Sequence, residues 1–242
     1  MAEWLLKFRA EFILNFIKDN RWKYIVNGLG VTLQVTFFAL FIGVAIGVIV
    51  AVVRSTYDKL GDSLRPGVGR NLIKFFDSLC RLYLTVIRGT PVVLQLMIMF
   101  YVIFGPSNNK ILAAILAFGI NSGAYVAEIV RGGIMSVDLG QNEAGRSLGF
   151  NYIQTMRYII IPQAFKNILP SLANEFIVLI KETSVCGYIA LQDLTKGADI
   201  IRGRTFSAFM PLIAAALVYL IMVIFFTQLV GRLERRLRNS DH

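Results

Sequence analysis

Histidine and cysteine are almost absent from this sequence of 242 residues. The one histidine is His242, which removes most zinc sites and most catalysis by histidine from consideration. The two cysteines, Cys80 and Cys186, are far apart and indicate neither a disulfide framework nor a metal cluster. A G-x-x-x-x-G-K-[ST] phosphate loop is also missing. We therefore expect no catalytic residues, no metal ligands and no directly bound cofactor.

Charged residues are scarce as well, at 17% of the chain, whereas hydrophobic residues make up 56%. This apolar excess, with a mean hydropathy of +0.62, is more than a soluble core of this size can bury, and it indicates a membrane protein. The net charge of +10 could suggest nucleic acid, but the basic residues flank apolar runs. That arrangement favours anionic membrane lipid as the partner and argues against nucleic acid.

Five apolar segments are candidates for crossing the membrane. A bilayer core of about 30 Å requires about 20 mostly apolar helical residues. The strongest segments are 28–53 and 205–231, which carry no charge. Two more are the uncharged run 89–109, extended backward to about residue 79, and the run 111–127. The fifth, 163–180, is interrupted by Lys166, Asn174 and Glu175.

The first 27 residues have a different pattern. Charges interrupt residues 1–20, so this stretch holds no continuous signal-peptide core. Trp4, Phe8, Phe12 and Phe16 recur at helical spacing, which favours an amphipathic helix in the membrane interface. We expect residues 1–27 to form this segment and residues 28–242 to form a single membrane domain.

Five spans place the two termini on opposite sides of the membrane. With the N-terminus outside, 13 basic residues lie on the inner side and 10 on the outer side, which favours this orientation and a cytoplasmic C-terminus. The sequence has no internal repeat. Since five helices without an inverted repeat have difficulty enclosing a polar pathway, we expect a dimer.

Polar residues inside three of the spans predict a pathway near the midplane of the bilayer. From the helical rise, Arg88 to Thr90, Asn121 to Tyr125, and Asn174 with Glu175 all lie about 15 to 17 Å into their spans. Polar groups in lipid require a partner, a cavity or water, and transporters hold their cargo near this depth.

A zwitterionic amino acid is one cargo that these groups could bind. Arg88 and the backbone freed around Pro91, which lacks an N–H, could bind its carboxylate. Glu175 could bind its ammonium group, together with polar side chains nearby. Arg88 and Glu175 could instead pair with each other as a structural lock. The candidate pathway residues are Arg88, Gly89, Thr90, Gln95, Asn121, Ser122, Tyr125, Asn174, Glu175 and Glu182.

Three further features of the spans have structural alternatives. Glu128 lies three residues before Arg131, and we expect these two to form an ion pair on one helix face. Glu182 lies near the outer end of its span, where it could meet the substrate or anchor the helix. Gly43 and Gly47 belong to a stripe of small residues that predicts helix packing.

The stretch 143–162, "EAGRSLGFNYIQTMRYIIIP", lies between two apolar segments. Asn142 is a candidate N-cap for a short helix, and Glu143 would then lie near its positive end. Gly149 can end this helix, because glycine accepts backbone angles that other residues resist. Taken alone, these signals also fit a simple interfacial loop helix. The predicted helix covers about residues 141–150.

The same stretch resembles the EAA signature of ATP-binding cassette (ABC) importer permeases. The signature comprises Glu143, Ala144, Gly145, Gly149 and the Ile159-to-Pro162 end of the stretch. Gly145 stands where alanine is usual, and Ile161 where leucine is usual. In that family the signature forms a cytoplasmic coupling helix that docks on the ATPase subunit. The resemblance assigns coupling to Glu143, Ala144, Gly145 and Gly149.

Other segments resemble the branch of these permeases that imports polar amino acids, the histidine, glutamine, glutamate and arginine type. They are "VIRGTPVVLQL", "NSGAYVAEIVRGGI" and "IIIPQAFKNILPSLANEFIVLIKETS". The resemblance implies an all-α, type I permease fold with five transmembrane helices in a bacterial cytoplasmic membrane. It also implies a second permease subunit, identical or related, two ATPase subunits that bind ATP and Mg, and an extracytoplasmic amino-acid-binding protein.

Two other classes of function fit the sequence less well. A channel or secondary transporter would also use polar groups at the midplane, but it leaves the EAA stretch without a partner. An intramembrane enzyme would need a nucleophile with a base, or a metal site, and neither H-E-x-x-H nor G-x-S-x-G occurs. The sequence leaves open which amino acid is carried.

The EAA signature generates the first prediction. Replacing Gly149 by Asp should uncouple ATP hydrolysis from transport without unfolding the protein, because a larger, charged side chain prevents close docking on the ATPase. Uptake and expression are measured together. Retained uptake at normal expression would contradict the assignment of a coupling helix.

Overall fold

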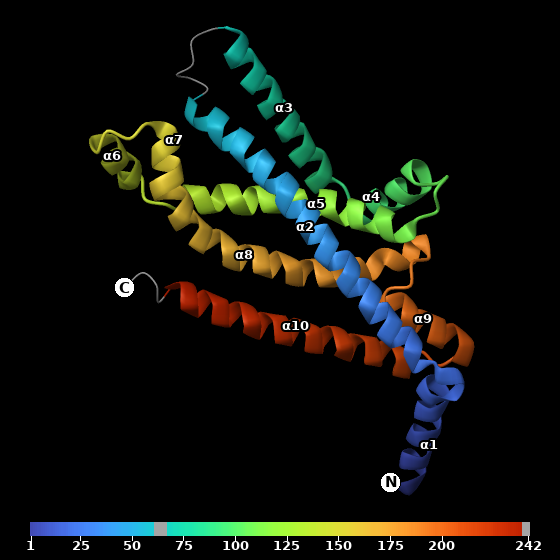
Figure 1. Ribbon diagram of the computed structural model, residues 1–242. Coiled ribbons are helices and arrows are strands. Elements are labelled where there is room, and N and C mark those ends of the chain that lie inside the picture. Colours follow the sequence, from blue (N-terminus) through green and yellow to red (C-terminus); the bar gives the residue numbers. More distant parts are fainter. Residues whose placement is uncertain (61–66, 239–242) are drawn as a thin grey trace. The chain divides into compact units, whose positions relative to one another are not determined.

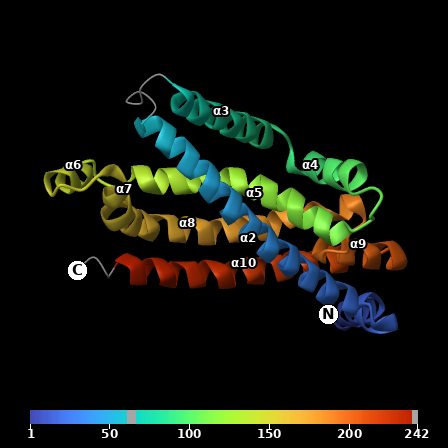
Figure 2. The ribbon, with the colours of Figure 1, turned by 45° about the horizontal axis from the view of Figure 1, so that its top comes forward.

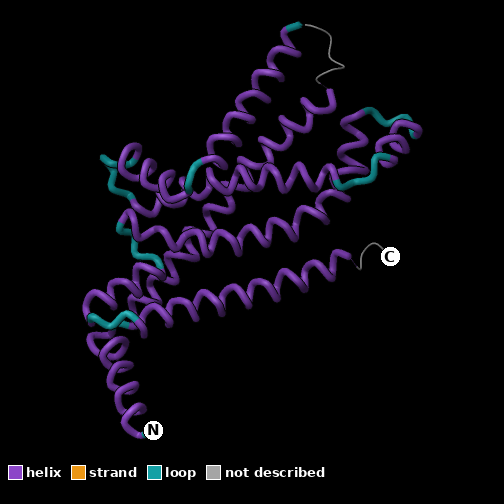
Figure 3. Tube along the Cα trace, turned by 180° about the vertical axis from the view of Figure 1, so that it is seen from behind, coloured by secondary structure: helices purple, strands orange, loops and turns teal. Residues whose placement is uncertain are grey.

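The computed structural model describes residues 1–60 and 67–238, and these residues form helices joined by short connections, without a strand (Figures 1 and 3). Its long helices are α2 (Trp22–Leu60), α3 (Val68–Gly89), α5 (Lys110–Met135), α8 (Ile161–Glu182) and α10 (Phe209–Arg238). Its shorter helices are α1 (Ala2–Phe12), α4 (Val92–Ile98), α6 (Gly140–Ser147), α7 (Tyr152–Thr155) and α9 (Leu194–Thr205). Its π-helical and 3₁₀ turns are η1 (Ile13–Ile17), η2 (Lys18–Asn20), η3 (Met99–Ile103), η4 (Met156–Ile160) and η5 (Thr183–Ile189).

Within the described residues, three helices are long and apolar enough to cross a membrane. They are α2, α5 and α10, and the pair formed by α3 and α4 qualifies as a fourth span if it is counted as one. The fifth predicted span corresponds to α8, which does not qualify on apolarity because polar residues interrupt it. The all-helical membrane architecture is confirmed, and the number of five spans remains a prediction.

The second predicted span is broken at a proline. The prediction of a continuous helix from about residue 79 to 109 was wrong, because α3 starts at Val68 and ends at Gly89. Thr90 is extended, as expected for a residue before proline, and α4 then starts at Val92. The two helices meet at an angle of 106°. Arg88 therefore lies in the last turn of α3.

The chain divides into two compact units, each of which contains parts of the longest helices. The first unit comprises residues 1–39, 92–118 and 177–226, and the second unit comprises residues 40–91, 119–176 and 227–242, of which residues 61–66 and 239–242 lie outside the described part.

The N-terminal segment packs within the first unit. Phe16 is buried against Ile201 of α9 and Met210 of α10, and the amide of Asn15 accepts a 2.8 Å hydrogen bond from Thr205. By contrast, the large apolar side chains of α1 are exposed, including that of Trp4. α1 is therefore helical as predicted, and its place in the membrane interface stays a prediction.

The second unit is packed through glycines on α2. Gly43 lies against Ser122 of α5, and Gly47 lies against Val126. A β-carbon on Gly47 would be 2.5 Å from a methyl carbon of Val126 and 2.9 Å from the backbone nitrogen of Ala127. The predicted packing role of the small-residue stripe is confirmed, since α2 and α5 approach too closely here for side chains.

This close approach predicts different effects of alanine at two glycines of the same helix. Gly47→Ala should destabilise the protein by about 1 to 3 kcal/mol, because the added methyl overpacks the α2–α5 contact. Gly30→Ala is the control, since a β-carbon there meets no atom within 4 Å. Thermal unfolding in detergent should show a lower Tm for Gly47→Ala alone. Equal Tm values for the two variants would contradict the packing.

Candidate functional site

Glu175 and Ser122 form a buried polar contact in the second unit. The hydroxyl of Ser122 donates a 2.8 Å hydrogen bond to Oε1 of Glu175. Ser122 is 0% exposed and Glu175 is 7% exposed. Gly43 of α2 lies directly against Ser122, and Asn121 is buried beside it on α5. Ser122 of α5 thus contacts α8 through Glu175 and α2 through Gly43, and Figures 1 and 2 show the course of these three helices.

Arg88 belongs to a second, more open cluster in the same unit. Its guanidinium lies 3.5 Å from a carboxylate oxygen of Glu128 and 5.8 Å from the centre of the Tyr125 ring. Both charged side chains are nearly half exposed, at 46% and 43%. Arg88 therefore pairs with Glu128. The alternative prediction, a structural ion pair between Arg88 and Glu175, was wrong.

The expected pair of Glu128 with Arg131 was wrong. Arg131 instead donates hydrogen bonds of 2.9 and 3.2 Å to Asp58 at the end of α2. The reason is geometric: the ends of α2 and α5 meet, so Arg131 reaches an acceptor on another helix. Sequence spacing within one helix could not indicate this partner.

The remaining predicted pathway residues are distributed over both units. Thr90 donates a hydrogen bond of 2.8 Å to the carbonyl of Val86, and Gly89 ends α3. Asn174 is exposed on α8, next to the buried Glu175. Gln95 in α4 and Glu182 at the end of α8 belong to the first unit. The structure thus brings together Ser122 and Glu175, and separately Arg88, Tyr125 and Glu128. Asn121 is buried on α5 next to Ser122 in the sequence.

α8 also presents a polar stripe that the sequence reading missed, apart from Asn174. Gln163, Asn167, Ser171 and Asn174 are all exposed and follow the helical repeat. Their spacing of four, four and three residues would have predicted one helix face. A polar face on a membrane helix is unfavourable against lipid, so this face requires water or a partner.

The EAA stretch forms a helical hairpin, which comprises α6, α7 and η4 and is called the coupling hairpin below. The predicted N-cap was wrong: α6 starts at Gly140, and Asp138 accepts a 2.7 Å hydrogen bond from the N–H of this glycine. Glu143 lies in the first turn, as predicted. Gly149 follows the end of the helix with a φ of +82°, which confirms its predicted role as a stop.

Gly145 and a capping box hold the coupling hairpin together. A β-carbon on Gly145 would be 2.8 Å from Thr155, so α6 and α7 touch at this position. Asn151 and Gln154 form a capping box at the start of α7. Gly145 is therefore buried within the hairpin, whereas Glu143, Ala144 and Gly149 are exposed. The large apolar residues Leu139, Leu148 and Ile153 in and next to the hairpin are also exposed.

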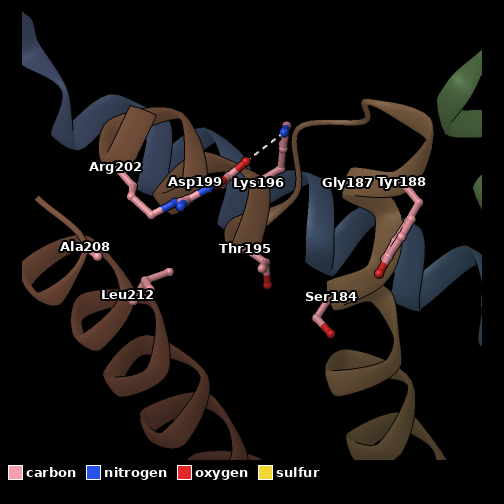
Figure 4. Close-up of a pocket in the computed structure, with 9 residues that line it drawn as sticks. All are labelled: Ser184, Gly187, Tyr188, Thr195, Lys196, Asp199, Arg202, Ala208 and Leu212. Atoms are coloured by element: carbon pink, nitrogen blue, oxygen red, sulfur yellow. Dashed lines mark hydrogen bonds and ion pairs between the residues drawn. The ribbon is translucent and has the colours of Figure 1, made fainter. Parts of the chain in front are cut away.

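The first unit contains a cavity of about 450 Å³ between η5, α9 and the start of α10 (Figure 4). Its walls include the apolar side chains of Ala208 and Leu212. At one edge, Asp199 accepts a hydrogen bond of 2.8 Å from Lys196 and one of 2.9 Å from Arg202. These hydrogen bonds hold the pKa of Asp199 below its ordinary value.

Comparison with known proteins identifies relatives along nearly the whole chain. The family model described as a binding-protein-dependent transport system inner membrane component matches residues 67–239. The arginine transport system permease protein ArtQ of Bacillus subtilis is 41% identical over 66% of this chain and 74% of its own length. A putative glutamine transport system permease protein GlnP of Rickettsia bellii is 35% identical over 98% of this chain and 99% of its own length.

A solved structure supports the same relationship. The chain is similar to a chain in the crystal structure of an amino acid ABC transporter with histidines, with a TM-score of 0.80 and 41% identity. The similarity covers 91% of this chain and 98% of that chain. The described helices therefore share the fold of that chain.

The Asp199 cluster predicts a dependence of stability on pH. Because the pKa in the folded protein lies below the ordinary value of 3.8, the cluster stabilises the folded state above pH 3.8. This contribution is lost as the pH falls through the lowered pKa. Asp199→Asn should lower the Tm by about 1 to 3 °C at pH 7, and the difference should vanish in acid. A difference in Tm that persists in acid would contradict the ion pairing.

Proposed function

Because the chain belongs to the family of binding-protein-dependent transport system inner membrane components, we propose that it carries a polar amino acid into the cell. Like its relatives, it is a membrane permease subunit of an ABC importer and not an enzyme, and the ATPase resides in a separate subunit. The relatives are named for arginine and for glutamine, so the proposal covers polar amino acids as a class.

The buried contact between Ser122 and Glu175 is the observation that carries the proposal. Ser122 is the only hydrogen-bond partner of Glu175 within the described part of the chain, so this carboxylate retains unused acceptor capacity. A buried carboxylate is stable when a cation or several donors satisfy it. The ammonium group of an amino acid provides a positive charge and three donors. Asn121, the residue before Ser122 on α5, is buried as well and is a further proposed pathway residue.

Arg88 is the proposed group for the carboxylate of the substrate. It lies immediately before the break between α3 and α4, where Pro91 prevents a continuous helix. Its ion pair with Glu128 is half exposed, so a substrate carboxylate can replace Glu128 at little cost. Gly89 and Thr90 would add backbone groups at the same break. Tyr125 and Asn174 complete the proposed pathway within the second unit, and Gln95 and Glu182 are the pathway residues proposed in the first unit.

The coupling hairpin is the proposed contact with the ATPase. Glu143, Ala144 and Gly149 are exposed on it, and the exposed apolar residues around them form a surface that a partner would cover. Gly145 would act from inside the hairpin by keeping α6 close to α7. ATP and Mg would be bound by two copies of the ATPase subunit.

A second permease subunit and an external binding protein complete the proposed assembly. The exposed polar stripe of α8 favours a pathway that α8 lines together with the second subunit, because an exposed row of polar side chains is unfavourable against lipid. The second subunit is a copy or a relative of this chain. The external protein would deliver the amino acid from outside.

The basic residues of the sequence support the orientation of the assembly. We place the protein in a bacterial cytoplasmic membrane with the N-terminus outside and the C-terminus in the cytoplasm. In this orientation Arg232, Arg235 and Arg236 of α10 follow the last apolar segment on the inner side, where they can contact anionic lipid. The coupling hairpin then faces the cytoplasm, which contains the ATP.

The role of Glu175 can be tested by a conservative substitution. Glu175→Gln keeps the shape and the hydrogen bond from Ser122 but removes the charge that would bind the ammonium group. The ratio kcat/KM of ATP-driven uptake should fall at least about tenfold, since losing one charge of a buried pair has effects of this size. Uptake is measured in liposomes that contain the permease, its ATPase and its binding protein.

Glu234→Gln on the exposed end of α10 is the matched control and should leave uptake unchanged. Wild-type kcat/KM for Glu175→Gln, at an equal amount of assembled complex, would contradict the proposed site.

A further inference from the structure

The last turn of α2 makes two side-chain contacts within the second unit, one to the end of α5 and one to α7 of the coupling hairpin. Asp58 accepts hydrogen bonds from Nε and Nη2 of Arg131, at 3.2 and 2.9 Å, at the end of α5. Lys59, the next residue, places its ammonium group 5.8 Å from the centre of the Tyr152 ring on α7. α2 has no direct chain connection to α5 or to the hairpin. These side chains therefore connect elements that are otherwise separate in sequence.

Tyr152 is a firm attachment point on the hairpin. It is the first residue of α7, directly after Asn151 of the capping box. The α7 helix is in turn fixed to α6 through the contact of Gly145 with Thr155. A displacement of α6 therefore moves Tyr152 as well, and the cation–π contact transmits it to Lys59.

Arg131 is an attachment point on α5, at a fixed distance from the buried site. It follows Ser122 by nine residues on one uninterrupted helix, which corresponds to about 14 Å along the axis. The two side chains of the Asp58–Arg131 pair are only 35% and 31% exposed, so solvent screens the pair less than a surface pair. Movement of the α2 end relative to α5 would break this pair.

α2 also contacts the buried site, through Gly43, which lies fifteen residues before Asp58 in the same helix. Gly43 lies against Ser122, and Gly47 lies against Val126, without room for side chains. Close-packed helices move together or separate; they do not deform gradually. Residues 43–60 of α2 therefore form one helical segment of the second unit. Its glycines pack against α5 at one end, and Asp58 and Lys59 make their contacts at the other end.

We propose that Asp58 and Lys59, with Arg131 and Tyr152, are positioning residues that couple the hairpin to α2, so that its displacement reaches the contact of Ser122 with Glu175. This inference rests on the proposed function, because it presumes that an ATPase moves the hairpin. A cavity of about 460 Å³, lined by Ser55, Met135 and Val137 among others, lies along the same junction. This cavity gives the hairpin room to move, and the two contacts set how far α2 follows.

The test measures how many amino acids are transported per ATP hydrolysed by the reconstituted importer. Asp58→Asn and Arg131→Gln each break the ion pair, and each should lower this ratio by roughly two- to fivefold, the range that a partly exposed pair supports. The double variant should lose no more than either single variant. Asp199→Asn is the matched control, because it also breaks a partly exposed ion pair and should keep the wild-type ratio.

The contact between Lys59 and Tyr152 provides an independent pair of variants. Tyr152→Leu removes the aromatic ring and should lower the ratio, whereas Tyr152→Phe keeps the ring and should preserve it. Co-purification of the ATPase and its basal hydrolysis rate show whether each variant still assembles. A purely structural role would lower assembly and leave the ratio unchanged in the complexes that form.

Exchange of the charged partners completes the test. The swapped pair, Asp58→Arg with Arg131→Asp, should recover most of the wild-type ratio. Wild-type ratios in both single variants and in Tyr152→Leu would overturn the inference while leaving the proposed function intact. A wild-type complex without ATP-driven uptake would overturn both.

Discussion

The cost of burying a charge among apolar helices is the constraint on which the second unit depends. Glu175 is buried on α8, and among the described residues the hydroxyl of Ser122 on α5 donates a hydrogen bond to it. A carboxylate in such surroundings is unfavourable unless a partner satisfies it. An apolar residue of similar size would pack there at lower cost, and the proposed ammonium partner would account for a carboxylate at this position.

Backbone features create the space in which polar groups can act. Pro91 ends α3 and turns the chain, which leaves Arg88 at a helix end, where it reaches Glu128 and the ring of Tyr125. Gly43 lets α2 approach α5 at Ser122. In the coupling hairpin, Gly145 brings α6 against α7, and Gly149 adopts the left-handed conformation that ends the turn. Thus small or ring-constrained residues, more than charged ones, determine the geometry.

Much of this organisation could be predicted from the sequence. Apolar runs indicated the helices, Pro91 indicated a disturbed helix, and the spacing of Gly43 and Gly47 indicated packing. These signals are local, because they depend on residues a few positions apart. The partners of Arg88 and Arg131 could not be predicted in this way. Each lies on a different helix, and which helix ends meet is decided by packing over the whole unit.

Boundaries were the weakest part of the prediction. α2 starts at Trp22 and not at residue 28, because amphipathic turns continue directly into the apolar span. α6 starts at Gly140 and not near Asn142, because Asp138 accepts the hydrogen bond from the first N–H of the helix. In both cases several adjacent residues could have started the helix, and tertiary contacts decided among them.

The central claim is that the buried carboxylate recognises the ammonium group of an amino acid. The most direct measurement is calorimetric titration of the purified importer, without its binding protein, with arginine or glutamine and with the analogue of each that lacks the α-amino group. The account predicts that at least one amino acid binds and that its deaminated analogue binds at least about tenfold more weakly. Equal affinity for an amino acid and its deaminated analogue would contradict the account.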